Sequence, residues 1–366
     1  MERIYASGDL DARTYSVQWM PDSRYFARLV PDEQGVPELW RIEAESGDSV
    51  KLVSAAELRP PSASRPVHIE AVAFSARGNR VLLFTDAERV WRDRTRGSYY
   101  VFDIPTRRLI PVGAAPGDQM FAKFSPDAER VAFVRSGNLF VFDIAARTVR
   151  RLTHDGGETI VNGTSDWLYE EELGLRDAFR WSPDGRRIAF WRFDMTAVPV
   201  FELYDETSLY ARGVPIRYPK AGQPNSRVRL ATVDVGSAGT TWIDVEVSSD
   251  GYLPWMEWAS SGDEVMIQRL SRRQDRLDLL LADVRTGATR LLFTETSEAW
   301  LDVVDQVPWA AGGGQFLWTS DRDGWQHIYL YRRDGRLERQ LTRGEWDVTG
   351  VLGVDASERQ IYFSAA

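Results

Sequence analysis

The sequence predicts an all-β fold assembled from repeated four-stranded antiparallel sheets. Seven times along the 366 residues, an aromatic or apolar residue and a short turn rich in Pro, Asp, Ser and Gly precede an apolar strand. Successive turns lie roughly 45–57 residues apart, with one longer interval of 77. The chain also contains 14 Trp and 16 Phe, and large aromatic residues are enriched in strands. Repeats of about 40–50 residues are typical of a β-propeller, so we expect a propeller with about seven blades.

Each repeat starts with residues that favour a tight turn, because Pro presets φ and Asp or Gly accepts the turn geometry. These starts are Trp19–Asp22, Phe74–Gly78, Phe124–Asp127, Trp181–Gly185, Trp258–Gly262, Trp309–Gly313 and Val354–Ser357. An alternating apolar strand follows each turn, and most repeats continue with further strands, for example Tyr99–Ile104, Leu139–Ile144, Thr148–Leu152, Asp278–Val284, Thr289–Phe293 and Ile328–Tyr331. One such meander cannot bury both faces alone, so we expect the repeats to stack on one another.

Two segments are too long for the repeat and lie on either side of the fourth turn. Residues 154–173 precede this turn, and residues 204–227 follow the strand after it. Extra residues in a regular repeat map to loops, usually on a functional face. The second segment is rich in Tyr, Pro and Arg, and it fits either a projecting arm or a surface loop.

The first of these segments ends in Asp166–Leu173, which reads D-W-L-Y-E-E-E-L. Ser165 or Asp166 suits the N-cap of a short helix. Acidic residues are favoured in a first turn, where the helix dipole is positive. We therefore expect a short acidic helix near residues 165–174 that carries the triplet Glu170–Glu172.

Three adjacent carboxylates repel one another, and desolvation against Trp167 and Tyr169 would raise the cost of keeping them ionised. A bound cation would relieve this repulsion. Neighbouring helical side chains point about 100° apart, so two glutamates share a ligand only when it approaches an end or a bend of the helix. The alternative is a solvated acidic face that binds nothing.

Composition excludes several classes of protein. The formal charge is −9, from 45 basic and 54 acidic residues, whereas proteins that bind nucleic acid are normally basic. The absence of Cys excludes disulfides, thiolate zinc sites and Cys nucleophiles. No run of 18 apolar residues occurs, and residues 1–20 lack a signal-peptide pattern, so we expect neither a membrane span nor a leader in this chain.

The sequence also lacks a catalytic centre of its own. A serine hydrolase of the elbow type needs G-x-S-x-G, and the nearest match, Gly163–Trp167, has Trp in place of the second Gly. We interpret His68, His154 and His327 as structural. No H-E-x-x-H spacing and no G-x-G-x-x-G after a strand occurs, so we expect no metal and no cofactor.

Several motifs, in this order, resemble the propeller domain of dipeptidyl peptidase IV, in the S9B branch of the prolyl oligopeptidase clan. The most specific are D-W-L-Y-E-E-E-L at 166–173 and R-Y-P-K-A-G at 217–222. V-W-R at 90–92, D-R-D-G-W-Q-H-I-Y-L-Y at 321–331 and L-T-R-G-E-W-D-V-T-G at 341–350 extend the resemblance over nearly the whole chain.

The resemblance implies a serine exopeptidase that removes X-Pro or X-Ala dipeptides from free N-termini. The family's glutamate pair, which binds the α-ammonium group of the substrate, matches Glu171 and Glu172. Its arginine, which contacts a substrate carbonyl, matches Arg92. The alternative for Arg92 is a surface salt bridge within the basic stretch Arg89–Arg96.

The resemblance also implies a setting for this pair. Trp167, Tyr169 and Glu170 would support it from the same helix. The family has an aromatic residue and an arginine after a Trp-led segment, and here these positions hold Val304 and Asp305. The extended part of the substrate subsite therefore departs from the family pattern.

The family has eight blades and a C-terminal α/β-hydrolase domain that carries the nucleophile and the base. We therefore expect residues 1–366 to be a truncated propeller that lacks this domain and hydrolyses no peptide alone. The expected partners are the N-terminal segment of peptide substrates, the hydrolase domain of the same protein and, through the segment 204–227, a second copy. Neither nucleic acid nor a membrane span is expected, and the location would be periplasmic or otherwise extracytoplasmic in a bacterium.

Two other functions fit parts of the sequence. A non-catalytic propeller would bind a partner protein through its long insertions. An endopeptidase or acylpeptidase of the same clan would not need the paired glutamates.

Overall fold

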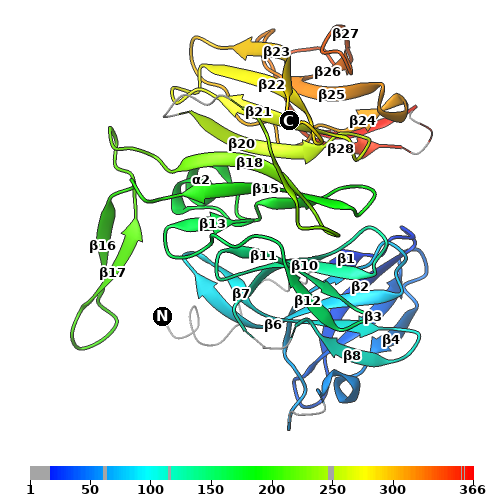
Figure 1. Cartoon of the computed structure of the whole chain (residues 1–366). Coiled ribbons are helices and arrows are strands. Elements are labelled where there is room, and N and C mark those ends of the chain that lie inside the picture. Colours follow the sequence, from blue (N-terminus) through cyan, green and yellow to red (C-terminus); the bar gives the residue numbers. More distant parts are fainter. Residues whose placement is uncertain (1–16, 61–63, 114–116, 246–250, 356, 358) are drawn as a thin grey trace, which may run out of the picture. The chain divides into compact units, whose positions relative to one another are not determined.

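The computed structural model describes residues 17–366 apart from 61–63, 114–116, 246–250, 356 and 358. Figure 1 shows sheets throughout, and strand neighbours pair antiparallel wherever their register is defined, as in β2 (Tyr25–Pro31) with β3 (Pro37–Glu43) and β15 (Arg187–Asp194) with β18 (Arg227–Asp234). The prediction of an all-β fold of antiparallel sheets is confirmed. The chain forms two compact units, one containing residues up to 133 with 142–149, and the other containing 134–141 with 150–366. Ala356, in the seventh predicted turn, lies outside the described residues.

The first unit begins with a sheet of four strands in chain order: β1 (Val17–Trp19), β2 (Tyr25–Pro31), β3 (Pro37–Glu43) and β4 (Ser49–Val53). A short 3-10 helix, η1 (Ala55–Leu58), follows. The next sheet has eight strands: β5 (Ile69–Phe74), β6 (Arg80–Val90), β7 (Asp93–Asp103), β8 (Arg108–Pro111), β9 (Gln119–Phe124), β10 (Arg130–Arg135), β11 (Asn138–Asp143) and β12 (Thr148–Arg151). Strands β10 to β12 contribute residues to both units. Leu39, Val81 and Phe102 are buried completely in the core of the first unit.

This eight-stranded sheet joins two repeats that the sequence predicts as separate. Strand β7 starts earlier than the expected Tyr99, and its extra residues Arg96 and Gly97 pair with Met120 and Gln119 of β9. Strands β6 and β7 also lie close together here, because a Cβ atom on Gly97 would lie 2.5 Å from the carbonyl oxygen of Thr85 in β6. The extension of β7 therefore depends on glycine at this position.

The Ser-Pro-Asp turns are stabilised by their own side chains. In the fourth repeat, the buried hydroxyl of Ser182 donates to Asp184 Oδ1 at 2.6 Å and accepts from the backbone N–H of Arg187 at 2.9 Å. Gly185 has φ of +66°, a conformation that glycine adopts without strain. Ser125 makes the same bonds to Asp127 and Arg130 in the third repeat, so the Ser-Pro-Asp sequence reflects a hydrogen-bonded turn that leads into the following strand.

The second unit holds the remaining elements. The first sheet contains β13 (Ile160–Asn162), β14 (Phe179–Trp181), β15 (Arg187–Asp194), β18 (Arg227–Asp234) and β19 (Thr240–Trp242), with helix α2 (Trp167–Leu173) after β13. The next two sheets have four strands each: β20 (Tyr252–Trp258), β21 (Glu264–Leu270), β22 (Arg276–Asp283) and β23 (Thr289–Thr296), then β24 (Trp309–Ala310), β25 (Gln315–Ser320), β26 (His327–Arg332) and β27 (Leu337–Gln340), with the 3-10 helix η2 (Ala311–Gly313) after β24. Strands β28 (Val348–Val354) and β29 (Ile361–Ala365) form a two-stranded sheet.

Inner strands bury several consecutive residues, among them the charged Asp278 in β22. The prediction of an alternating strand after each turn is wrong in β21, because Val265, Met266 and Ile267 follow one another and are all buried. Residues of β22 belong to one large core with residues from β15, β20, β21, β25 and β26. Continuous burial of this kind arises when a strand is covered on both faces.

The segment after β15 forms a hairpin of its own. Strands β16 (Val200–Asp205) and β17 (Arg212–Arg217) pair only with each other, and Figure 1 shows this hairpin projecting from the second unit. The structure thus agrees with the predicted arm rather than a plain loop. The hairpin begins at Val200, before the predicted boundary at 204, and it ends at Arg217, before the predicted boundary at 227.

Candidate functional site

Helix α2 carries the acidic triplet, as predicted, and Asp166 is its N-cap. Oδ1 of Asp166 accepts a hydrogen bond from the backbone N–H of Tyr169 at 2.9 Å. At the other end, Gly174 adopts a left-handed conformation with φ of +66°, and its N–H bonds to the carbonyl of Tyr169. Both helix ends therefore have the caps that stop such a short helix from fraying. Ser165, the other predicted cap, does not act as one.

Tyr169 anchors the helix in the core. Its side chain is 1% exposed, and its ring meets the ring of Phe193 edge to face at a centroid distance of 4.9 Å. The Tyr169 hydroxyl accepts a hydrogen bond from the backbone N–H of Leu253 in β20 at 3.0 Å. Burial raises the pKa of Tyr169, so this hydroxyl stays neutral.

Trp167 anchors the helix to the segment that follows the projecting hairpin. Its ring lies 4.4 Å from the ring of Tyr218, centroid to centroid, and Tyr218 in turn meets Phe201 of β16 at 5.8 Å. Lys220 places its ammonium 4.5 Å from the centre of the Phe201 ring. The two most specific sequence motifs, at 166–173 and 217–222, thus contact each other in the folded chain.

The three glutamates have different surroundings. Glu170 is buried, with 7% of the residue exposed, and its Oε1 lies 3.2 Å from Nε of Arg176. Glu171 is partly buried and Glu172 is exposed. The structure therefore separates one structural glutamate from two that solvent reaches, and these are the two that the sequence resemblance assigns to the substrate.

A buried hydrogen bond from a residue outside the helix holds its N-cap in place. The hydroxyl of Ser226 donates to Oδ2 of Asp166, and both residues are buried. Burial raises the pKa of Asp166 above its ordinary value. Sequence reasoning missed Ser226, because 60 residues separate it from Asp166 and no motif marks it.

Arg92 lies in the first unit. The other predicted site residues lie on α2 in the second unit: Trp167, Tyr169, Glu170, Glu171 and Glu172. Arg92 and Trp91 form the two-residue turn between β6 and β7, where Val90 pairs with Asp93. Trp91 has φ of +52°, and Arg92 is exposed, with its carbonyl accepting from Nε of Arg89 at 3.1 Å. The role predicted for Arg92 stays a prediction.

The loop that contains Val304 and Asp305 is held by the same sheet as the helix. Gln268, which is completely buried, donates to the carbonyl of Val304 at 2.6 Å and accepts from its N–H at 3.0 Å. The indole N–H of Trp255, in β20, donates to the carbonyl of Asp305 at 3.0 Å. Strand β20 therefore contacts α2 through Leu253 and this loop through Trp255.

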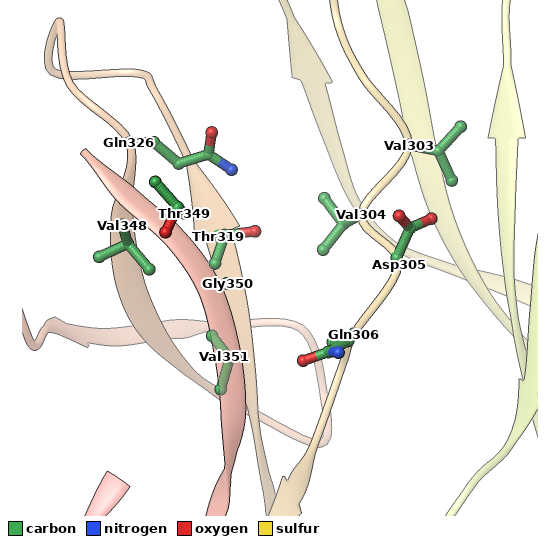
Figure 2. A pocket seen from close by; sticks show the side chains of 10 residues that line it. All are labelled: Val303, Val304, Asp305, Gln306, Thr319, Gln326, Val348, Thr349, Gly350 and Val351. Carbon is green, nitrogen blue, oxygen red and sulfur yellow. The ribbon is translucent and has the colours of Figure 1, made fainter. Parts of the chain in front are cut away.

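A pocket of about 180 Å³ lies beside this loop, and its lining includes Val304 and Asp305, the two positions at which the sequence departs from the family pattern. Its lining comes from the loop, β25, β28 and Gln326 (Figure 2). In Figure 2, Val304 points from the loop toward the β25 and β28 wall, and Val303 points to the other side. Asp305 is exposed; partial burial of its carboxyl and the charge of Asp302 raise its pKa.

The chemistry of the helix end suits a cation with several hydrogen-bond donors. Two solvent-accessible carboxylates on one rigid helix accept charge-assisted hydrogen bonds, which are about twice as strong as neutral ones. Among the residues that the structure describes, no group of three or more His, Asp or Glu is arranged to hold a metal ion. Within that same part of the chain, no helix is long and apolar enough to cross a bilayer.

Comparison with known sequences gives a consistent result. The profile of the dipeptidyl peptidase IV (DPP IV) N-terminal region matches residues 75–366. Dipeptidyl peptidase 4 of Trichophyton tonsurans is 32% identical over 300 residues, covering 78% of this chain and 38% of that protein. The same protein from Trichophyton rubrum matches to the same extent.

Solved structures agree with the sequence comparison. Dipeptidyl peptidase 4 of Porphyromonas gingivalis superimposes with a TM-score of 0.89 at 31% identity, over 98% of this chain and 51% of that one. A structure from Bacteroides ovatus, with a TM-score of 0.76 at 19% identity, supports the fold alone. The chain thus spans about half the length, or less, of the proteins it matches.

Proposed function

The chain belongs to the family of dipeptidyl peptidase IV N-terminal regions, and from this membership we propose that it anchors and gates substrates for a serine-type dipeptidyl peptidase. The substrates are peptides with a free N-terminus, from which X-Pro or X-Ala dipeptides are released. The observation that carries this proposal is the pair Glu171 and Glu172, which stand on a helix fixed by Asp166 and Tyr169.

The pair would bind the α-ammonium group of the substrate. A free α-amino group has a pKa of about 7.7–8.0, so near neutral pH it is mostly an ammonium ion with three donors. Glu171 and Glu172 would accept two of these hydrogen bonds. An acetylated or internal peptide has no such charge and forms neither of these charge-assisted hydrogen bonds, each of which contributes about 1.5–3 kcal/mol. By holding the N-terminus in place, the pair determines which peptide bond reaches the catalytic groups. It takes no part in bond breaking.

Bond breaking belongs to a different domain in this proposal. The sequence contains no G-x-S-x-G, and the matched relatives are at least about twice as long as the matched part. We assign the nucleophile and the base to a C-terminal α/β-hydrolase domain of the same protein. The sheets of the present chain would form seven blades of an incomplete propeller beside it, with Arg92 contributing a donor to a substrate carbonyl. An extracytoplasmic location, such as the periplasm, fits such a peptidase.

Kinetics with matched substrates test this function. The longer protein that contains this chain should hydrolyse the Ala-Pro amide of aminomethylcoumarin and leave its N-acetyl derivative nearly untouched, with kcat/KM lower by about 100-fold or more. The isolated 366-residue chain should hydrolyse neither substrate. Equal turnover of the free and acetylated amides would overturn the proposal.

A second proposal concerns the projecting hairpin. Leu209 and Tyr210, in its turn, are 92% and 82% exposed, and Tyr204 is 69% exposed. A two-stranded hairpin with apolar side chains in water has little stability of its own. The hairpin also exposes side chains of both charge signs, including the negative Glu202 and the positive Arg212. A two-fold symmetric contact could pair these opposite charges and cover the apolar side chains, so we assign its partner as the same hairpin of a second copy of this chain. An interaction with a different protein, as in the non-catalytic alternative, would use the same surface.

A further inference from the structure

We propose that Ser226 and Asp166 are positioning residues for the ammonium-binding pair; this inference rests on the function proposed above. The argument starts from the size of the helix. Helix α2 has seven residues, so it is about 10 Å long. An isolated helix of this length is not stable in water. The positions of Glu171 and Glu172 on the helix therefore depend on the contacts that hold the helix in place.

The N-cap is the contact that fixes the first turn. Asp166 uses both carboxylate oxygens, with Oδ1 accepting from the N–H of Tyr169 at 2.9 Å and Oδ2 accepting from the hydroxyl of Ser226. Asp166 is 4% exposed and Ser226 is 7% exposed, so water does not readily replace either partner. The Ser226 hydroxyl thus fixes the rotation of the carboxylate that caps the helix.

Loss of this hydroxyl would change the cap more than the fold. A buried carboxylate oxygen without its donor carries a desolvation penalty, and the Asp166 side chain would rotate to relieve it. The Tyr169 hydroxyl and the contact between Trp167 and Tyr218 would still hold the helix against the core. We therefore expect a helix that persists but is less well oriented, so that the ammonium binds more weakly while the reacting groups are unchanged.

Two neighbours of the pair provide contrast. Ser165 directly precedes Asp166, and Asn225 directly precedes Ser226. Each of these two neighbours is 5% exposed. Their side-chain polar atoms have no hydrogen-bond partner among the described residues. Substitution of Asn225 removes a buried polar side chain from the same place without removing a donor to Asp166. Asn225→Ala is thus the matched control for Ser226→Ala.

The experiment measures kcat and KM of the longer protein for the Ala-Pro amide, together with the ratio of kcat/KM for the free and acetylated forms. Ser226→Ala should raise KM about tenfold, leave kcat within about twofold and lower the ratio about tenfold. Asn225→Ala should leave all three values within about twofold. Ser226→Thr and Ser226→Val, which have similar size, separate the hydroxyl from the volume. Thr should keep a KM near that of the wild type, and Val should behave like Ala.

Three outcomes overturn the inference. The first is a Ser226→Ala variant with a lower melting temperature and an unchanged KM. The second is equal KM values for Ser226→Thr and Ser226→Val. This comparison tests the role of the hydroxyl even if Ser226→Ala fails to fold. The third is an Asn225→Ala variant with the same rise in KM. Failure of the proposed function is seen separately, because the wild-type protein itself would then turn over the free and acetylated substrates equally.

Discussion

The hydroxyl oxygen of Tyr169, in helix α2, accepts a hydrogen bond of 3.0 Å from the backbone N–H of Leu253 in strand β20. This bond joins the acidic helix to a strand 84 residues further along the chain. Because β20 also contacts the carbonyl of Asp305 through Trp255, the helix and the loop at 300–306 are held by one strand. The candidate site is thus positioned by a rigid sheet rather than by its own loops.

Removal of this hydroxyl should destabilise the second unit. Tyr169→Phe would leave the buried N–H of Leu253 without a partner, so we expect the free energy of unfolding to fall by about 1–3 kcal/mol. Urea denaturation measures this change. Tyr210→Phe, at an 82% exposed position, is the control and should have no effect. Equal stability of the two variants would show that the bond contributes nothing.

The contact between Trp167 and Tyr218 should show a favourable coupling energy. Their ring centroids lie 4.4 Å apart, and aromatic pairs contribute about 0.5–1.5 kcal/mol beyond their burial. A double-mutant cycle with Trp167→Ala and Tyr218→Ala isolates this coupling in the free energy of unfolding. A coupling near zero would mean that the hairpin segment and the helix are neighbours without stabilising each other.

The sequence predicted the parts of the site that depend on local chemistry. Helix α2 was predicted because an N-cap such as Asp166 acts on Tyr169, only three residues away. The turn at Ser182 was predicted for the same reason. Strand alternation in β21 was predicted wrongly, since its pattern depends on what covers the sheet rather than on the chain itself.

Long-range contacts were beyond the reach of sequence reasoning. The hydrogen bond from Ser226 to Asp166 joins residues 60 positions apart. The two hydrogen bonds between Gln268 and Val304 join residues 36 positions apart. An isolated Ser or Gln carries no periodic signal in the sequence. The boundary of the projecting hairpin was also misplaced, because residues from Val200 onward pair within the arm. Ring closure of the repeats and the role of Arg92 stay predictions.

The raised pKa of Asp166 predicts a pH-dependent effect of Asp166→Asn. Between the ordinary value of 3.8 and its higher folded value, the folded state binds more protons than the unfolded state, so stability falls as pH rises. Asn does not titrate and keeps an oxygen acceptor for the N–H of Tyr169. The free energy of unfolding of Asp166→Asn, relative to wild type, should therefore rise between pH 3 and pH 7.

Asp184→Asn provides the opposite control for this measurement. Burial alone would raise the pKa of Asp184, but hydrogen bonds from Ser182 and the backbone of Arg186 outweigh it and hold this pKa below 3.8. The relative stability of Asp184→Asn should therefore fall over the same pH range. Urea denaturation at several pH values distinguishes the two slopes. A flat or falling line for Asp166→Asn would contradict the assignment.

The hairpin surface predicts self-association. The 366-residue chain should sediment as a dimer at micromolar concentration, and Leu209→Ser with Tyr210→Ser should convert it to a monomer. Leu337→Ser, which changes an exposed leucine in β27, should leave the mass unchanged. A wild-type protein that stays monomeric over a hundredfold range of concentration would refute the proposed dimer surface.

The discrimination between free and N-acetylated Ala-Pro amides by glutamate variants of the longer protein tests the central claim most directly. Glu171→Gln and Glu172→Gln keep the shape of the side chains and remove one charge each, so each should lower kcat/KM for the free amine by about 10- to 100-fold and reduce its advantage over the acetylated form. Glu345→Gln, at an exposed position, should match the wild type. If both helix variants discriminate as well as the wild type, Glu171 and Glu172 do not bind the α-ammonium group, and the account of this site is wrong.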